Sequence, residues 1–324
     1  MGSPSFSSTG ISRESVSLQF SNRFFIIDDK NGDRMDAEIE IVKNFWEKHL
    51  CGEETASSVD ETEYFKKIDE YRYNLMDYLP EVARFADLRG KCVLEIGCGM
   101  GADAYQFAKN GAIYTGIDLT SEAVKTTQRR FSLFHVPGRI RVMDAEELEF
   151  PDNSFDHVYS FGVIHHSPHS EKIVKEIYRV LRKGDTTTVM LYNKHSINYY
   201  IEIMFLRKIL RYFLLLRGSP SFIAMLTGFD RTKLERHREI LLEHQNITKM
   251  QWISMNTDGP DCPLARVYSK SDCESLFNMF SLVDTKVYFF DKSHWSFLSK
   301  FIPKSSEFLG RTWGWHRIVF GQKL

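Results

Sequence analysis

Residues 93–119 read VLEIGCGMGADAYQFAKNGAIYTGIDL. The stretch opens with an apolar strand, passes through Gly97, Gly99 and Gly101 at alternate positions, and ends a second apolar strand on Asp118. Glycine adopts positive φ and has no β-carbon, so its main chain can approach a ligand closely. A helix that starts here adds free N–H groups and a partial positive charge. The stretch therefore predicts a strand-turn-helix unit that binds a ligand carrying an anionic group.

Short apolar strands and helical segments alternate around this stretch. Strands are predicted at 92–97, 112–119, 140–145, 155–161, 186–192, 285–291 and 315–323. Helices are predicted at 101–111, 121–134, 169–184 and 271–280. Regular alternation of this kind builds a parallel, doubly wound sheet with helices on both faces. We therefore expect a Rossmann-like α/β fold.

Helical patterns precede and interrupt the alternation. Residues 1–35 are polar and serine-rich at their start, which indicates a flexible N-terminus, and residues 36–89 form a helical leader. Residues 90–324 form one α/β domain. A helical insertion at 193–265 interrupts this domain after its fifth strand, and we expect it to cap the site where a second substrate binds.

One apolar stripe runs along a predicted helix of the insertion, with residues spaced every three or four positions. It consists of Ile201, Phe205, Ile209, Tyr212 and Leu216. Charged residues interrupt the surrounding sequence, so we expect no bilayer span. The favoured interpretation is that the stripe packs on its own domain. The alternatives are that it lies on a membrane or lines an apolar substrate cavity.

The composition narrows the class of protein. The chain has 324 residues and a net charge of −1, so no overall basic field recruits nucleic acid or an anionic membrane. Its five cysteines form no C-x-x-C pair, which fits buried thiols in a reducing compartment better than a disulfide framework or a zinc site. The first residues lack the apolar segment of a secretory signal. We therefore expect a cytoplasmic protein.

Acidic residues follow the second and third predicted strands. Asp118 ends the second, where a carboxylate can accept hydrogen bonds from both hydroxyls of a ribose. The fourth strand leads to FGVIHH (161–166) at the sheet edge where open α/β sheets bind ligands. The elements VLEIGCGMG, GIDLT, DAEELEFPDNSFDHVYSFGVIHH and IYRVLRKG resemble class I S-adenosylmethionine-dependent methyltransferases, especially the subgroup similar to ubiquinone/menaquinone-pathway (type 11) enzymes. The resemblance covers roughly residues 90–192.

The resemblance implies a seven-stranded sheet whose last strand is antiparallel, with S-adenosylmethionine bound above the first four strands. The methionine part of the cofactor would lie by Glu95, Gly97, Cys98, Gly99, Gly101, Phe161 and Gly162. The ribose and adenine would lie by Asp118, Leu119, Asp144, Ala145 and Glu146. From the leader, Tyr64 and Arg72 would close over the cofactor, and Arg72 could pair with its carboxylate. An ion pair of Arg72 with Asp69 or Asp77 is the alternative.

Fewer residues define the acceptor side. His165 or His166 could act as a general base, although a histidine that only braces this loop is the alternative. Tyr192 ends the fifth strand, at a position that commonly faces the acceptor in the family. Similar chains carry a polar turn like 256–259 near their active site. No carboxylate or cysteine lies at an obvious ligand spacing from the histidines, so we predict no metal site.

These features predict an enzyme that transfers the methyl group of S-adenosylmethionine to a small, apolar or amphipathic metabolite by in-line displacement, which leaves S-adenosylhomocysteine. Members of this family that methylate the exocyclic amines of nucleic-acid bases usually carry an N/D-P-P-Y/F motif after the fourth strand. This chain has FGVIHH there, so no nucleic-acid partner is expected. Peripheral membrane contact stays open. The alternatives are a peptide or protein methyltransferase and a protein that binds the cofactor without turnover.

Overall fold

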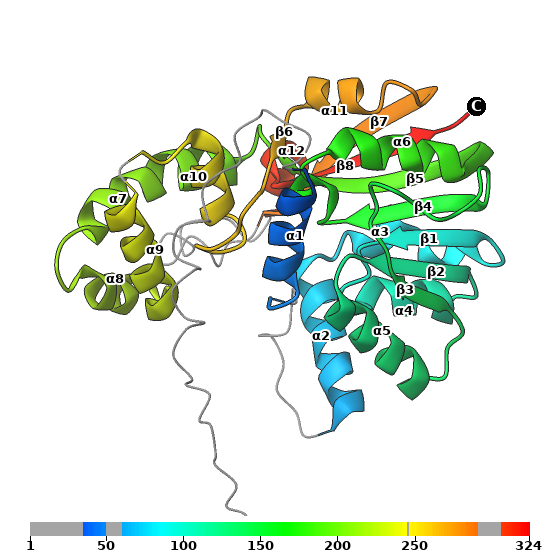
Figure 1. Ribbon diagram of the computed structural model, residues 1–324, viewed down its shortest axis with the longest axis horizontal. Helices are drawn as coiled ribbons and strands as arrows, with labels where there is room; N and C mark the ends of the chain where they lie inside the picture. Colours follow the sequence, from blue (N-terminus) through cyan, green and yellow to red (C-terminus); the bar gives the residue numbers. More distant parts are fainter. Residues whose placement is uncertain (1–34, 50–59, 245, 291–305) are drawn as a thin grey trace, which may run out of the picture.

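A mixed β-sheet forms the centre of the molecule (Figure 1). The computed structural model describes residues 35–49, 60–244, 246–290 and 306–324, and within them the sheet has eight strands. They are β1 (Cys92–Ile96), β2 (Ile113–Asp118), β3 (Arg139–Val142), β4 (Phe155–Phe161), β5 (Leu181–Asn193), β6 (Val267–Tyr268), β7 (Leu282–Tyr288) and β8 (His316–Gln322).

The strand order confirms the predicted topology. Seven strands follow the order β3-β2-β1-β4-β5-β8-β7, and the two-residue β6 pairs with β5. Strands β1 to β5 pair in parallel, and β8 is antiparallel to both of its neighbours, β5 and β7. The fold is therefore the expected Rossmann-like sheet with an antiparallel last strand, to which β6 adds one short strand.

Helices cover both faces because the strands are apolar on both sides. The covering helices are α4 (Ala102–Lys109), α5 (Ser121–Leu133), α6 (Ser170–Val180) and α11 (Lys270–Leu276). Val93 and Tyr159 pack with α4 and α5, whereas Leu94 and Val158 pack with α6 and α11. Neighbouring residues of one strand thus point into opposite cores, as the pleat requires.

The remaining helices belong to the leader, the insertion and the C-terminal region. The leader contains α1 (Met35–Trp46), α2 (Glu61–Leu75), α3 (Leu79–Ala83) and a 3₁₀ turn (Phe85–Leu88). The insertion contains a π-helix (Asn198–Leu206), α7 (Arg207–Leu214), α8 (Ser219–Thr227), α9 (Arg231–Glu243) and α10 (Lys249–Met255), and α12 (Ser306–Trp313) precedes β8. The insertion forms a lobe at the left of Figure 1, and α1 lies between this lobe and the sheet. The expected flexible N-terminus falls almost wholly outside the described residues.

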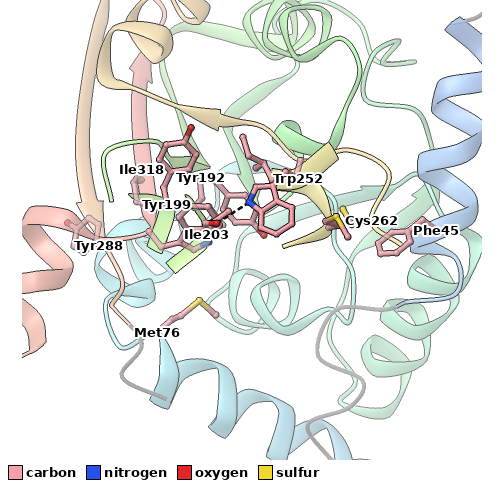
Figure 2. Close-up of a cluster of buried hydrophobic side chains, with 14 of the residues drawn as sticks. Phe45, Met76, Tyr192, Tyr199, Ile203, Trp252, Cys262, Tyr288 and Ile318 are labelled. Carbon is pink, nitrogen blue, oxygen red and sulfur yellow. Dashed lines mark hydrogen bonds between the residues drawn. The ribbon is translucent and has the colours of Figure 1, made fainter. Parts of the chain in front are cut away.

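An apolar cluster anchors the lobe and the leader to the sheet (Figure 2). It joins Phe45 of α1 and Met76 after α2 to Tyr192 of β5 and Trp252 of α10. The indole Nε1 of Trp252 donates a hydrogen bond to the carbonyl of Ile203 at 3.0 Å, so its polar atom is satisfied in the interior. The leader and the insertion therefore meet at the end of β5.

The predicted helix 169–184 is wrong at its C-terminal end. Helix α6 ends at Val180, and β5 begins at the next residue, Leu181. Leu181 is fully buried and pairs with Phe155 of β4. Pairing and burial in the sheet thus outweigh the helical propensity of this segment, which is a weak preference.

The apolar stripe of the insertion faces outward, so the prediction that it packs on its own domain is wrong. Its five residues are 43–73% exposed, whereas Tyr199, Ile203 and Leu214 of the same segment are buried. Residues 198–206 form a π-helix, whose wider turns change the angle between successive side chains. The segment is apolar on two faces, and the tertiary packing buries the face that the regular spacing did not indicate.

Candidate active site

A cavity of about 540 Å³ opens at the carboxyl ends of β1, β2, β4 and β5. Open α/β sheets bind ligands at this edge, and small-molecule sites commonly have volumes of about 300–1,000 Å³. Helices α1 and α2 of the leader form the opposite wall. Among the described residues of the insertion, only Asp258 lies in the wall, so the apolar stripe does not line this cavity. The expected capping role of the insertion stays a prediction.

Most predicted site residues lie in the wall of this cavity. They are Arg72, Glu95, Gly97, Cys98, Gly99, Asp118, Leu119, Asp144, Ala145, Glu146, Phe161, Gly162, His166 and Tyr192. Of the predicted set, Tyr64, Gly101 and His165 lie outside the wall. Tyr64 instead packs beside Phe65 in a small apolar cluster between α2 and the C-terminal end of α5.

The three glycines of the turn all have positive φ, but for different reasons. A β-carbon on Gly97 would lie 2.1 Å from Cγ2 of Val163, and one on Gly101 would lie 2.9 Å from Oγ1 of Thr127. A β-carbon on Gly99 would meet no atom within 4 Å. Packing inside the protein therefore requires Gly97 and Gly101, while Gly99 leaves open space beside the cavity.

Alanine substitutions should separate these roles. We expect Gly97→Ala to lower the free energy of unfolding by roughly 2–5 kcal/mol, because left-handed strain and overpacking against Val163 add together. Gly99→Ala should cost only about 1–2 kcal/mol of strain while weakening binding of S-adenosylhomocysteine. Urea unfolding and calorimetric titration measure the two effects. Equal destabilisation by both substitutions would contradict this assignment.

Asp118 connects β2 to the glycine turn. Its Oδ2 accepts a hydrogen bond from the amide of Gly99 at 3.0 Å. Its Oδ1 accepts from the amide and hydroxyl of Thr120 at 3.0 and 2.8 Å. A carboxylate has about four acceptor positions, so one remains for a ligand hydroxyl. The predicted contact with both ribose hydroxyls would require one of these three bonds to break. Burial raises the pKa of Asp118 above its usual value.

Arg72 is half-buried and pairs with the buried Asp103, a contact that the sequence did not predict. Its Nε and Nη2 donate to the two carboxylate oxygens of Asp103 at 3.0 and 2.5 Å. The hydroxyls of Tyr73 and Tyr159 donate to the same carboxylate at 2.8 and 2.9 Å. Burial acts to raise the pKa of Asp103, but Arg72 and these hydrogen bonds hold it below its usual value. The ion-pair partner is thus Asp103 rather than Asp69 or Asp77, and this pair uses the Nε and Nη2 edge of the guanidinium. The contact of Arg72 with a cofactor carboxylate stays a prediction.

Glu95 is a second buried carboxyl group beside the glycine turn. Its side chain accepts a hydrogen bond from the hydroxyl of Tyr114 at 2.5 Å. Burial, reinforced by the negative charge of Asp103, raises the pKa of Glu95 well above its usual value. A positive charge placed nearby would stabilise the ionised form. This part of the cavity therefore favours a cationic group.

Asp144 and Glu146, which we expect beside the adenine, already accept hydrogen bonds from other residues of the protein. Asp144 Oδ1 accepts from the amide of Glu146 at 2.8 Å. The carboxylate of Glu146 accepts from the hydroxyl of Ser167 at 2.7 Å and contacts Nδ1 of His169 at 3.0 Å. Glu146 therefore braces the loop after β4, although it also lines the cavity.

Three segments bring an imidazole, a phenol and a carboxylate together at the other end of the cavity. His166 follows β4, Tyr192 lies near the end of β5, and Asp258 follows α10. Nδ1 of His166 lies 2.6 Å from the carbonyl oxygen of Leu264, so we assign the N–H to Nδ1 and the lone pair to Nε2.

The free carboxylate oxygen of Asp258 completes this group. The hydroxyl of Tyr192 donates to Oδ1 of Asp258 at 2.8 Å. Oδ2 is buried without a hydrogen-bond partner and lies 3.6 Å from Nε2 of His166. A base and a carboxylate therefore lie side by side in the cavity wall. The polar turn 256–259, suspected from its sequence, contributes this carboxylate.

His165 does not belong to this group. Its side chain is fully buried, and its ring packs on Tyr192 with centroids 3.8 Å apart. Burial lowers the pKa of His165 well below its usual value. A neutral, enclosed imidazole fits the bracing role rather than the general base.

The leader closes over both ends of the cavity, which the sequence indicated only in general terms. Trp46 of α1 lies edge-on to His166, with ring centroids 4.9 Å apart. The carboxylate of Glu47 accepts from the backbone N–H of Ser121 at 2.9 Å, in the first turn of α5. The end of helix α1 is thus held by contacts with the loop after β4 and with the start of α5.

His166, Asp258 and Cys262 are a group of metal-ligand types whose ligand atoms all lie within 4.8 Å of one another. The sequence spacing did not indicate this group, because the chain brings Asp258 and Cys262 to His166 from far away. Burial and the nearby Asp258 raise the pKa of the Cys262 thiol well above its usual value, and Sγ donates to the carbonyl of Leu264 at 3.6 Å. These three residues are of types that bind metals, so the absence of a metal site stays a prediction.

Comparison with known proteins concerns the domain that carries this cavity. Residues 94–188 match a methyltransferase domain family of type 11. The chain is 32% identical over 172 residues to phosphoethanolamine N-methyltransferase 2 of Caenorhabditis elegans, an alignment that covers 51% of this chain and 39% of that protein. It is 27% identical over 215 residues to a ubiquinone biosynthesis O-methyltransferase of Chromobacterium violaceum. This alignment covers 66% of this chain and 85% of that protein. The chain spans about two fifths of the length of the first curated relatives that it matches.

A solved structure shares the fold. Magnesium protoporphyrin IX methyltransferase from Synechocystis, with bound S-adenosylhomocysteine, superimposes with a TM-score of 0.51 at 13% identity. The superposition covers 88% of this chain and 99% of that one. Residues 94–188 are therefore a methyltransferase domain, and the strand order and glycine turn fit the class I S-adenosylmethionine-dependent type.

Proposed function

We propose that this protein transfers a methyl group from S-adenosylmethionine to an oxygen or nitrogen atom of a small, apolar or amphipathic acceptor. The observation that carries the proposal is the pair of His166 and Asp258, which lies in the same cavity wall as Gly99 and Asp118. One end of the cavity suits a nucleoside with a positive charge, and the other end holds a base.

The residues of the glycine turn fit the cofactor. Glu95 is a buried carboxyl whose ionised form a cationic group would stabilise, and the cofactor carries a sulfonium and an ammonium. Gly99 leaves open space, and Asp118 retains one acceptor position for a hydroxyl. When bound, the cofactor supplies an electrophilic methyl group.

The protein's own contribution is proton transfer and alignment. Nε2 of His166 accepts the proton of the acceptor hydroxyl or amine while the acceptor atom bonds to the methyl carbon and the carbon–sulfur bond breaks. Asp258 stabilises the resulting imidazolium, and Tyr192 holds Asp258 in place through its hydroxyl. The Leu264 carbonyl keeps Nδ1 protonated, so Nε2 stays available.

Aromatic side chains favour an apolar acceptor. Trp46, Tyr192 and Trp315 line the cavity, and Trp315 stacks on Tyr192 with centroids 4.5 Å apart. One relative is named for a polar acceptor, phosphoethanolamine, and the other for the biosynthesis of ubiquinone. The aromatic residues in the cavity wall favour an apolar acceptor over a polar one such as phosphoethanolamine.

Methyl-labelled S-adenosylmethionine, incubated with the purified protein and a metabolite extract, tests the proposal. We expect label in a small apolar product. Asp118→Ala should weaken cofactor binding about 5- to 150-fold, because a hydrogen bond worth about 1–3 kcal/mol is left unmade. The matched control Asp87→Ala, at an exposed surface ion pair, should bind normally. Label in a polypeptide, or cofactor binding with no labelled product, would replace this proposal by one of the two alternatives.

A further inference from the structure

We propose that the outer face of the insertion binds the surface of a membrane that contains anionic phospholipids. The face begins on the helical segment 198–216, where seven large apolar side chains are 43–73% exposed. They are Tyr200, Ile201, Phe205, Ile209, Tyr212, Phe213 and Leu216. A soluble protein rarely leaves so many large apolar side chains together in water, so this face requires a partner.

Helix α8 extends the same face. Phe222, Met225 and Leu226 are 58–73% exposed, and α8 packs beside α7. Both helices lie at the end of the lobe that is farthest from the sheet (Figure 1). The face is therefore remote from the active-site cavity and is formed by two adjacent short helices, which suits contact with a broad surface.

The charges on these helices select the kind of surface. Between residues 198 and 227 the chain has Arg207, Lys208, Arg211 and Arg217 against one acid, Glu202. Glu202 is buried and paired with Arg207, whereas Lys208 and Arg217 are exposed beside the apolar residues. Basic residues around an apolar helix face are the pattern of helices that lie in the interface of an anionic bilayer.

Contact with the bilayer would be peripheral. Among the residues that the structure describes, no helix is both long and apolar enough to cross a membrane. A second copy of this chain is the competing occupant of the face. A symmetric dimer would place the same basic residues of both copies close together, and like charges oppose such contact. An anionic lipid surface instead complements them.

Sedimentation of the full chain with phosphatidylcholine vesicles, with and without phosphatidylserine, tests the proposal. We expect at least about tenfold stronger binding to the phosphatidylserine vesicles, weakened by high salt, because several basic residues contribute. Phe213→Ser with Leu216→Ser should reduce this binding about tenfold or more. Lys208→Glu with Arg217→Glu should remove the preference for phosphatidylserine.

Matched controls separate this surface from other effects. Ile113→Ser with Leu282→Ser removes two side chains of similar exposure, 60% and 58%, on the sheet, and should leave vesicle binding unchanged. All variants should bind S-adenosylhomocysteine like the wild type. A loss of vesicle binding can therefore be distinguished from a loss of the proposed methyl transfer. A folded wild-type protein that ignores both kinds of vesicle would overturn the proposal. A dimer in solution that Phe213→Ser with Leu216→Ser disrupts would overturn it in favour of a second copy.

Discussion

Replacing His166 by alanine is expected to lower kcat by about 10²–10⁴-fold while leaving cofactor affinity unchanged, because proton transfer by a positioned base contributes this much. Nδ1 of His166 donates to the carbonyl of Leu264, which leaves the lone pair on Nε2, and the residue lies in the cavity wall. Substrate turnover under saturating cofactor gives kcat, and calorimetric titration with S-adenosylhomocysteine gives the affinity.

Two further substitutions sharpen this test. Asp258→Asn should also lower kcat, because an amide does not stabilise the imidazolium that forms at His166. The matched control His169→Ala removes a histidine of the same loop whose own side chain lies outside the cavity wall, and it should change kcat little. Full activity of His166→Ala would eliminate the base and leave an acceptor that reacts without one.

Mild acid is expected to destabilise the fold through its buried histidines. Burial lowers the pKa of His157 to about 4 and that of His316 to about 3, and it also lowers the pKa of His165. The unfolded chain binds protons at these groups near pH 6.5, whereas the folded chain does so only well below this value. Their contribution to stability is therefore complete above about pH 6.5 and is lost as the pH falls toward the folded pKa values.

The contribution of a single histidine, His157, to the pH dependence of stability can be measured separately. Between about pH 7 and pH 5 the linkage relation assigns roughly 2 kcal/mol of lost stability to His157 alone. Glu95 acts in the opposite direction, because its raised pKa makes the folded state bind a proton that the unfolded state has released. The total loss is thus smaller than the sum over the histidines, and a difference between variants isolates one group.

Urea unfolding at the two pH values therefore compares the wild type with His157→Gln. We expect the variant to lose about 2 kcal/mol less stability than the wild type on acidification. The control His195→Gln replaces an exposed histidine and should follow the wild type. Identical acid sensitivity of all three proteins would show that His157 already binds its proton in the folded state.

The fold could be predicted because its signals are local. The apolar strands, the glycine turn and the acid at the end of β2 each occupy a few consecutive residues, and parallel strands joined by helices allow few topologies. The carboxyl ends of such strands meet at one edge, which brought most of the predicted residues into the cavity wall. The boundary between α6 and β5 was missed because pairing with β4 decided it.

Contacts between distant segments were the part that could not be predicted. Asp103 resembled an ordinary acid in the first turn of a helix, yet it is the partner of Arg72, 31 positions away. Glu47 reaches the first turn of α5 across 74 positions. No spacing rule connects such residues, since their meeting depends on how the leader packs against the domain.

The amino-acid sequence by itself determined the sheet, the glycine turn and the identity of the groups at the sheet edge, because hydrophobic period and turn chemistry act between near neighbours. The tertiary structure alone decided which histidine faces the cavity, which carboxylate approaches it, and which side of the insertion remains in contact with water. His165 and His166 are adjacent in the chain and chemically identical, and the segment 198–216 is apolar on two faces. Only packing against distant residues buries one histidine and leaves the other in the cavity wall. The same kind of packing buries one apolar face of the segment and leaves the other in water.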